Sequence, residues 1–319
     1  MLPLTTLEDI QRVRASLPAS IRRTPLLQLA REASEVGKEK LQLKAECLQI
    51  TGAYKPRAAF AVINALSQES LSKGLVLTSS GNFAQAFAYA GSYGRIPIVV
   101  VMLDTTNPYK VDMARNFGAE VVFCGTDALS RQATVERIAS DRGMTAIDTW
   151  EAQPIVAGHG SLGLEILEDE KEIQTVLVPV SSGGGAAGVA AAIKQSRPSV
   201  RVIGVQPERA NAAYESLKQG EPTAIDYWET IADGLSAVRP GEYPFRHLQK
   251  YLDEIVLVTE SEILEAVRTI IFRAKVIAEP AGATATAAFL AGKVDTSRRT
   301  VAIVTGGNIT QAVLAKALS

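Results

Sequence analysis

The sequence predicts an α/β fold in which helices cover a parallel sheet on both faces. Two observations predict it. Short runs rich in β-branched residues alternate with longer helical patterns from about residue 75 onward, which is typical of βαβ units. Several of these runs are apolar throughout, as strands covered on both faces are. At 319 residues the chain is long enough for roughly two domains.

The elements can be placed in order along the chain. A capping box formed by Thr5 and Glu8 predicts the start of an N-terminal helix. The predicted strands span residues 75–80, 96–103, 119–125, 175–180, 200–206, 254–260 and 300–307. Helical spacing follows at residues 83–94, 127–140 and 185–196. The stretch 238–245 contains Pro and Gly and is predicted to be a surface loop.

The composition argues against several classes of partner. Thirty-three basic and 34 acidic residues give a formal charge of −1, which offers no electrostatic footprint for nucleic acid or an anionic membrane. The N-terminal residues show no pattern of a signal peptide or membrane anchor, and no apolar run is long enough for a bilayer span. We therefore expect a cytoplasmic protein whose partners are small molecules.

The cysteines and histidines point away from metal and hydrolase chemistry. Cys47 and Cys124 have no metal-ligand spacing and lie beside apolar runs, so we expect reduced thiols in the core. Only two histidines are present, His159 and His247. A His-rich metal site or a Ser-His-Asp triad is hard to assemble from them.

Three loops follow predicted strands, where ligands bind in open α/β sheets. The loop at 79–82 (SSGN) leads at once into a helix, whose first N–H groups favour an anion. In the loop at 181–185 (SSGGG), consecutive glycines let backbone N–H groups close on a phosphate. This loop matches neither a P-loop nor GxGxxG, so a phosphate is implied without a nucleotide triphosphate. Thr305, in the third loop, would point toward the same crevice.

Lys55 poses a separate question. It lies in the stretch TGAYKPRAAF, after a glycine turn and an aromatic neighbour and before a proline and an apolar helix. It is either an ordinary solvated lysine or a nucleophile. A lysine amine attacks an aldehyde only in its neutral form, which an apolar setting favours.

Six stretches, taken in order, resemble one family. TGAYKPR, SSGNFAQA, VPVSSGGGAAG, ETIADGL, EPAGA and VTGGN resemble the fold type II pyridoxal-phosphate (PLP) enzymes, specifically the serine/threonine dehydratase and serine racemase family. The resemblance implies two open, twisted, mostly parallel sheets flanked by helices, and pyridoxal 5'-phosphate as cofactor. It also implies a large PLP-binding domain of residues 1–45 and 147–319, and a small domain of residues 46–146 that closes over the substrate.

The resemblance implies roles for individual residues. Lys55 would form the Schiff base with the cofactor and later remove the α-proton of the substrate. Tyr54 would lie against one face of the cofactor ring, Asn82 would hydrogen-bond its hydroxyl, and Thr305 would be the partner of its nitrogen. The phosphate would be held by Ser181, Ser182, Gly183, Gly184 and Gly185. The substrate carboxylate would be received by Thr51, Ser79 and Gln85.

Ser80 leaves the reaction type open. Family members that racemise carry a serine at this second position of the SSGN loop, on the ring face opposite the lysine, where it can reprotonate the α-carbon. Many pure dehydratases have alanine there. Ser80 is therefore either a second catalytic residue in contact with the substrate or one more small turn residue.

Several residues depart from the family pattern. Phe83 stands where histidine is common and makes the pocket wall more apolar. Gln206 and Ala212 stand where metal-activated relatives have carboxylates, which a hard cation prefers, so we predict no metal site. Glu279 is expected to cap the helix that follows it through its carboxylate. His159 is expected to be structural.

These features together predict a PLP-dependent lyase. The expected reaction is β-elimination of water from a β-hydroxy amino acid of the serine/threonine type, which gives a 2-oxo acid and ammonia. A racemase that uses Lys55 and Ser80 on opposite faces is the alternative, and a β-replacement enzyme is a further one. A non-catalytic amino-acid-binding protein would leave Lys55 idle. The family suggests a homodimer, and the sequence leaves open which amino acid is used.

Overall fold

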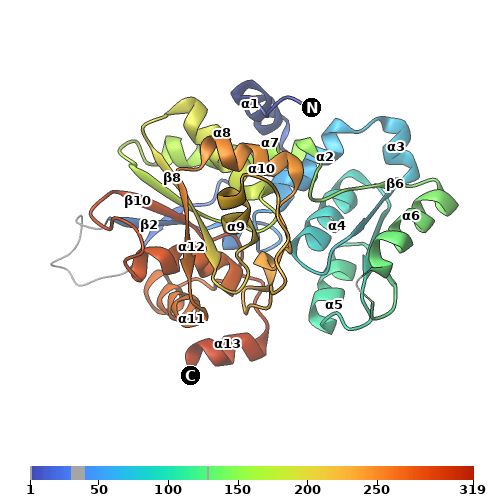
Figure 1. The fold of residues 1–319 in the computed structure, drawn as a ribbon. Helices are drawn as coiled ribbons and strands as arrows, with labels where there is room; N and C mark the ends of the chain where they lie inside the picture. The colour runs from blue at the N-terminus through green and yellow to red at the C-terminus, as the bar shows by residue number, and fades with distance from the viewer. Residues whose placement is uncertain (1, 30–39, 128) are drawn as a thin grey trace.

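Two sheets organise the fold in this computed structural model, which describes residues 2–29, 40–127 and 129–319 (Figure 1). The larger sheet has six strands in the order β1-β2-β10-β7-β8-β9, and all neighbours are parallel except β1 and β2. Its strands are β1 (Leu26–Gln28), β2 (Leu41–Lys44), β7 (Thr175–Pro179), β8 (Arg201–Pro207), β9 (Glu254–Val258) and β10 (Thr300–Ile303). The smaller sheet is parallel throughout, in the order β5-β4-β3-β6. Its strands are β3 (Leu75–Thr78), β4 (Ile98–Met102), β5 (Glu120–Phe123) and β6 (Thr145–Ala146).

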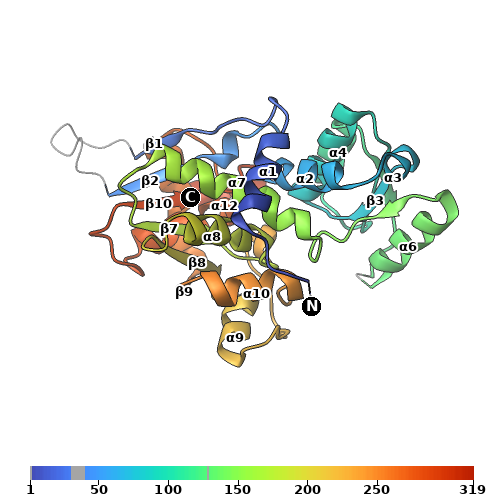
Figure 2. The same ribbon diagram turned by 90° about the horizontal axis from the view of Figure 1, so that it is seen from above.

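Helices cover both faces of the six-stranded sheet (Figures 1 and 2). The side chains that alternate along β7 and β10 pack into two separate hydrophobic clusters, one on each face. The first face carries α1 (Leu7–Ser16), α7 (Gln153–Asp169), α8 (Gly184–Ser196) and α10 (Glu242–Tyr251). The opposite face carries α11 (Glu260–Thr269), α12 (Pro280–Leu290) and α13 (Gln311–Leu318). Helix α9 (Ala212–Gln219) lies beside α10.

The four-stranded sheet is built in the same way. Leu75, Leu77 and Val100 pack against the helices of one face, whereas Val76 and Val99 pack against the other. The first face carries α2 (Pro56–Ala65), α4 (Asn82–Gly94) and α5 (Pro108–Asn116), and the second carries α6 (Ser130–Arg142). Helix α3 (Gln68–Lys73) precedes β3.

Small residues let the helices approach each other closely. Helix α8 is buried along most of its length and packs against α7. A Cβ atom on Gly188 would lie 2.2 Å from the carbonyl oxygen of Val156, so a larger residue would force the two helices apart. This contact holds the start of α8 at a fixed place above the sheet.

The predicted fold class is confirmed, and all seven predicted strands are present. The short strands β1, β2 and β6 were missed. The strands of the small sheet all lie between residues 75 and 146, and α2 packs against both α7 and α4. The limits of the two domains, at residues 46 and 146, remain a prediction. In the part of the chain that the structure describes, none of the helices combines the length and the apolar character that a membrane span needs.

Two local predictions were wrong. The capping box is formed by Thr6 and Asp9 rather than by Thr5 and Glu8. Thr5 is engaged elsewhere, because its hydroxyl lies 2.9 Å from the Tyr243 hydroxyl and its N–H donates to His247. The stretch 238–245 is not a surface loop: α10 begins within it, and several of its side chains are buried.

Candidate active site

A pocket opens beyond the carboxyl ends of β7 and β10, and the predicted loops converge there. It is lined by Tyr54, Lys55, Asn82, Pro179, Ser181, Ser182, Gly183, Gly184, Gly185, Gly234, Leu235, Glu279, Ala281 and Thr305. Every residue predicted to bind the cofactor is in this set. Their individual roles remain predictions, but they share one site.

Lys55 stands at the pocket between two aromatic rings. Its Nζ lies 4.7 Å from the ring centroid of Tyr54 and 4.2 Å from that of Phe83. Pro56 begins α2 directly after it, which is favourable because the first turn of a helix needs no N–H donor. Residues 51–55, which end in Lys55, form the lysine loop. The N–H of Tyr54 in this loop donates to the Thr305 carbonyl at 3.0 Å and ties the loop to the segment that follows β10. The amine is thus held against apolar surface at a strand end.

Tyr54 is held between a histidine and a glycine. The ring of His159, in α7, stacks on Tyr54 with centroids 4.3 Å apart. A Cβ atom on Gly185 would lie 2.4 Å from Tyr54 Oη, so the glycine leaves room for the phenol. His159 is fully buried, and no described residue hydrogen-bonds either ring nitrogen. Burial lowers its pKa well below the usual value, and the charges of Lys55 and Arg57 lower it further, so the ring is neutral.

The loop at 181–185 has the features of a phosphate cradle. It leads into the N-terminus of α8, which no described side chain caps, so its first N–H groups are available. Gly183 has φ of +105°, a conformation that favours glycine. The free N–H groups and the positive end of the helix dipole suit an anion, and the two serines add hydroxyl donors. This part of the pocket fits the phosphate of the predicted cofactor.

Asn82 is held at both ends of its amide group. Its Nδ2 donates to Glu279 Oε1 at 2.7 Å, and its Oδ1 accepts from Asn308 Nδ2 at 2.7 Å. Asn308 also donates to the Thr51 carbonyl at 2.9 Å and to Gln85 Oε1 at 3.3 Å. Asn308 therefore ties together one predicted cofactor residue and two predicted substrate residues. Sequence reasoning missed Asn308, although it closes the VTGGN stretch that follows β10.

The expected role of Glu279 was wrong. It occupies the N-cap position of α12, but its side chain makes no capping hydrogen bond. The carboxylate turns into the pocket and meets Asn82 instead. Burial, followed by the charge of Asp233, raises the pKa of Glu279 to about 7.

The residues predicted to receive the substrate do not line the pocket. Thr51 and Gln85 are buried beside it, and no described residue hydrogen-bonds the Thr51 hydroxyl. Ser79 and Ser80 lie in the turn between β3 and α4, where the Ser79 hydroxyl accepts from the N–H of Gly81 at 3.3 Å. Their contact with a substrate remains a prediction.

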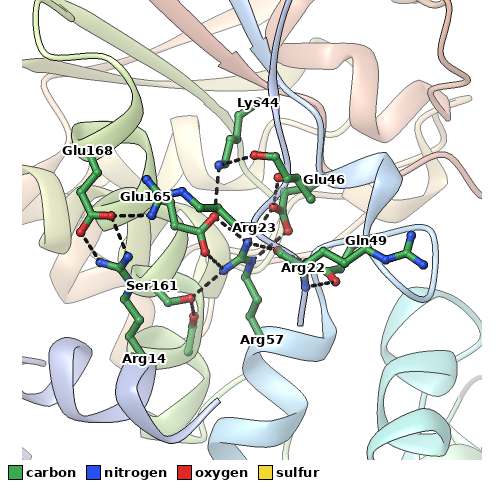
Figure 3. A network of polar contacts seen from close by, with 12 residues as sticks. Arg14, Arg22, Arg23, Lys44, Glu46, Gln49, Arg57, Ser161, Glu165 and Glu168 are labelled. Carbon is green, nitrogen blue, oxygen red and sulfur yellow. Dashed lines mark hydrogen bonds and ion pairs between the residues drawn. The ribbon is translucent and has the colours of Figure 1, made fainter. Parts of the chain in front are cut away.

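A buried network of ion pairs around Arg57 lies next to the lysine loop and holds it in place (Figure 3). Arg57, in α2, is fully buried and makes paired hydrogen bonds to both Glu46 and Glu165, at 2.8–2.9 Å. Lys44 extends the network to Glu165 and Asp169. Burial opposes ionisation of Glu46, but the charge and hydrogen bonds of Arg57 outweigh it and lower its pKa.

The network fixes the start of α2 to α7. Arg57 follows Lys55 by two residues, and its guanidinium also donates to Ser161 of α7. A planar guanidinium with two bidentate partners has little freedom to move. Lys55 is thereby positioned relative to the six-stranded sheet.

Gln206 and Ala212, which stand where metal-activated relatives carry carboxylates, have other surroundings in this structure. The Gln206 amide donates to the carbonyls of Val180 and Ala210, at 3.2 and 3.3 Å, and accepts from the N–H of Tyr214 at 2.8 Å. Ala212 is buried at the start of α9. Among the described residues, no group of three or more His, Cys, Asp or Glu side chains could hold a metal. The absence of a metal requirement stays a prediction.

Comparison with known proteins decides the family. The profile of the family described as "Pyridoxal-phosphate dependent enzyme" matches residues 17–306. The chain belongs to this family. A catabolic L-threonine dehydratase (TdcB) of Staphylococcus aureus strain USA300 is similar to this PLP enzyme, with 37% identity over 310 residues, 96% of this chain and 90% of that protein.

Solved structures agree with this assignment. The threonine deaminase isoform 2 of Solanum lycopersicum, in its processed form, superposes on this PLP enzyme with a TM-score of 0.90 and 30% identity, and the match covers 98% of this chain and 92% of that one. Maize serine racemase superposes with a TM-score of 0.91 and 30% identity, and the match covers 99% and 97%. The predicted serine/threonine dehydratase and racemase family, the fold type II architecture, the lyase class and the PLP cofactor are confirmed.

Proposed function

We propose that this PLP enzyme removes water from a β-hydroxy amino acid of the serine/threonine type and releases a 2-oxo acid and ammonia. One observation carries the proposal: the Lys55 amine lies in the same pocket as the uncapped start of α8. The similarity to an L-threonine dehydratase and a threonine deaminase supports the reaction type.

Different residues of the pocket would bind different parts of the cofactor. The loop at 181–185 and the start of α8 would hold the phosphate. Tyr54 would support the ring from one face, and the Asn82 amide would meet the ring hydroxyl. Thr305, at the end of β10, would place a neutral hydroxyl at the ring nitrogen. A neutral partner leaves that nitrogen unprotonated, which moderates carbanion formation and suits β-elimination.

Lys55 would carry the proton transfer. When bound, the cofactor supplies an electron sink for the charge left at the α-carbon. In its neutral form, the Lys55 amine can accept the α-proton. The α C–H and Cβ–O bonds break, and the departing hydroxyl takes up one proton, equivalent to the one that Lys55 accepted from the α-carbon, so that one water is lost. Hydrolysis of the resulting enamine gives the 2-oxo acid and ammonia.

A substrate panel tests this function. Release of 2-oxo acid would be measured from L- and D-forms of serine, threonine, 3-hydroxyaspartate and phenylserine. We expect turnover of at least one substrate by the wild type, and its loss in Lys55→Ala. Lys73→Ala is the matched control, because Lys73 forms an exposed ion pair with Glu69 on α3. Oxo-acid release that survives in Lys55→Ala would contradict the proposal.

Racemisation is the second candidate. Ser80 lies in the turn after β3, two residues before the start of α4 at Asn82. The similarity to maize serine racemase supports this alternative. Inversion of L- to D-amino acid that is lost in Ser80→Ala, while oxo-acid release persists, would establish it. A wild type that shows no inversion with any substrate of the panel would exclude it.

We also infer that the protein is a homodimer in the cytoplasm, as its family suggests. Sedimentation velocity tests the dimer: a single species at the mass of one chain would contradict it.

A further inference from the structure

Glu279 has no part in the function proposed above, yet it lines the same pocket as Lys55 and Asn82. Its carboxylate accepts the hydrogen bond from Asn82 that fixes the amide of that residue. Gly306 makes room for it, because a Cβ atom there would lie 2.2 Å from Glu279 Oε1. A carboxylate buried to this degree is costly unless neighbouring groups hold it in place.

Three charged groups lie near enough to Glu279 to influence its charge, each from a different element. Asp233 comes from the short 3-10 helix η3 (Asp233–Leu235), Lys110 from α5, and Lys55 from the start of α2. Lys110 and Asp233 form an ion pair with each other. This pair joins a helix of the four-stranded sheet to a segment that packs on the six-stranded sheet. Because η3 also supplies Gly234 and Leu235 to the pocket wall, the ion pair lies at the rim of the pocket.

We propose that Glu279 is a positioning residue for Asn82, and that the Lys110–Asp233 pair is a latch between the two parts of the molecule that sets the charge of Glu279. While the latch is closed, Lys110 partly balances Asp233, so Glu279 is ionised in a larger share of molecules than when the latch is open. The hydrogen bond from Asn82 is then charge-assisted and strong. The inference rests on the proposed function for the role of Asn82 at the cofactor.

Opening of the latch has the opposite effect. Without Lys110, the Asp233 carboxylate faces Glu279 unbalanced, and a like charge favours the protonated form of Glu279. A neutral carboxyl is a weaker acceptor, so the Asn82 amide is held less firmly and keeps only its hydrogen bond from Asn308 at full strength. The Asp233 side chain is 59% exposed and the Lys110 side chain 21% exposed, and an ion pair with one partner so open to water is weak enough to break and re-form during turnover.

The acidity of Glu279 suits such a device. Burial first, and the charge of Asp233 second, raise its pKa to about 7, against the hydrogen bond from Asn82 and the charges of Lys110 and Lys55. The carboxyl therefore titrates near neutrality, where a modest change in local charge alters its protonation.

The test follows the protonation of Glu279 in the holoenzyme. Its carboxyl resonance, labelled with carbon-13 and assigned by difference from Glu279→Gln, is titrated in wild type, Lys110→Met and Asp233→Asn. We expect the midpoint to rise in Lys110→Met and to fall in Asp233→Asn, each by about half a pH unit or more. Lys73→Met, which removes an exposed pair on α3, should leave it unchanged. If the two substitutions only loosened the structure, the titration midpoint of Glu279 would shift in the same direction in both variants.

A second readout reports on Asn82. The absorbance of the lysine-bound cofactor should follow pH with the same midpoints, and Glu279→Gln should remove that response. Neither readout needs turnover, so inactivity with every substrate would contradict the proposed function and leave the latch intact. Shifts in the same direction in Lys110→Met and Asp233→Asn, or none in either, would overturn the latch. An absorbance response that survives in Glu279→Gln would overturn the positioning role.

Discussion

The imidazole of His159 stacks on the phenol ring of Tyr54, with centroids 4.3 Å apart and ring planes at 25°. His159 is held by α7, whereas Tyr54 belongs to the lysine loop. The stack therefore sets the tilt of the ring that borders both Lys55 and Gly185. A histidine that looked structural in the sequence supports one wall of the active site.

His159→Phe should make the protein less sensitive to acid. The pKa of His159 is lowered in the folded state, so the unfolded chain binds the extra proton and the wild type loses stability as pH falls below about 6.5. Phenylalanine keeps the stack without the titration. We expect its stability relative to wild type to grow by up to about 1.4 kcal/mol per pH unit below about pH 6.5. Urea unfolding at several pH values measures the free energy of unfolding of both proteins. A difference between them that is independent of pH would contradict the prediction.

Arg57→Met should be severely destabilising. The substitution leaves Glu46 and Glu165 buried without their cation, and breaking such a pair costs about 3–5 kcal/mol. Arg12→Met is the control, because Arg12 is exposed and its ion pairs contribute less than about 1 kcal/mol. Equal losses in the two variants by urea unfolding would show that the buried network does not stabilise the fold.

Gly185→Ala should weaken cofactor retention. The new Cβ atom would lie 2.4 Å from Tyr54 Oη, and the stack on His159 limits how far that ring can move. Overpacking of about 1–3 kcal/mol corresponds to roughly 5- to 150-fold weaker binding of pyridoxal phosphate. Gly184→Ala is the neighbouring control, since its Cβ would meet a methyl group of Ile155 at 3.1 Å. Equal affinities in the two variants, measured by cofactor fluorescence, would contradict the steric argument.

Activity should not depend on a divalent cation. The amide of Gln206 makes three hydrogen bonds to backbone groups. This position therefore offers no carboxylate, the ligand that a hard cation prefers. We expect the rate of oxo-acid release to be unchanged by a chelator and by added magnesium or calcium. A rate that falls on chelation and recovers with the cation would show the prediction to be wrong.

Short sequence patterns predicted those parts of the site that are formed by residues close together in the chain. Buried strands such as β7 and β10 are apolar along their length, and the glycines at 183–185 stand at a strand-to-helix junction, so both are visible in a single stretch of sequence. The position of Lys55 before a proline and an apolar helix is visible in the same way. The family resemblance then supplied the roles that the residues alone left open.

Contacts between distant residues could not be predicted in this way. Asn308 and Asn82 are 226 residues apart, and Lys110 and Asp233 are 123 apart, so their meeting depends on how the two sheets pack together. Glu279 has the sequence context of a helix cap, yet the space beside Gly306 lets its carboxylate turn toward Asn82. Likewise, Thr5 and Thr6 are both suited to an N-cap, and the contact of Thr5 with Tyr243 decides between them.

The proposed function depends above all on Lys55 as the residue that carries the cofactor. The most direct measurement is reduction of the holoenzyme with borohydride, followed by peptide mapping of the modified lysine. We predict a single pyridoxyl label on Lys55, and its absence from Lys55→Ala. A label on any other lysine, or an unlabelled Lys55 in cofactor-loaded protein, would contradict the account.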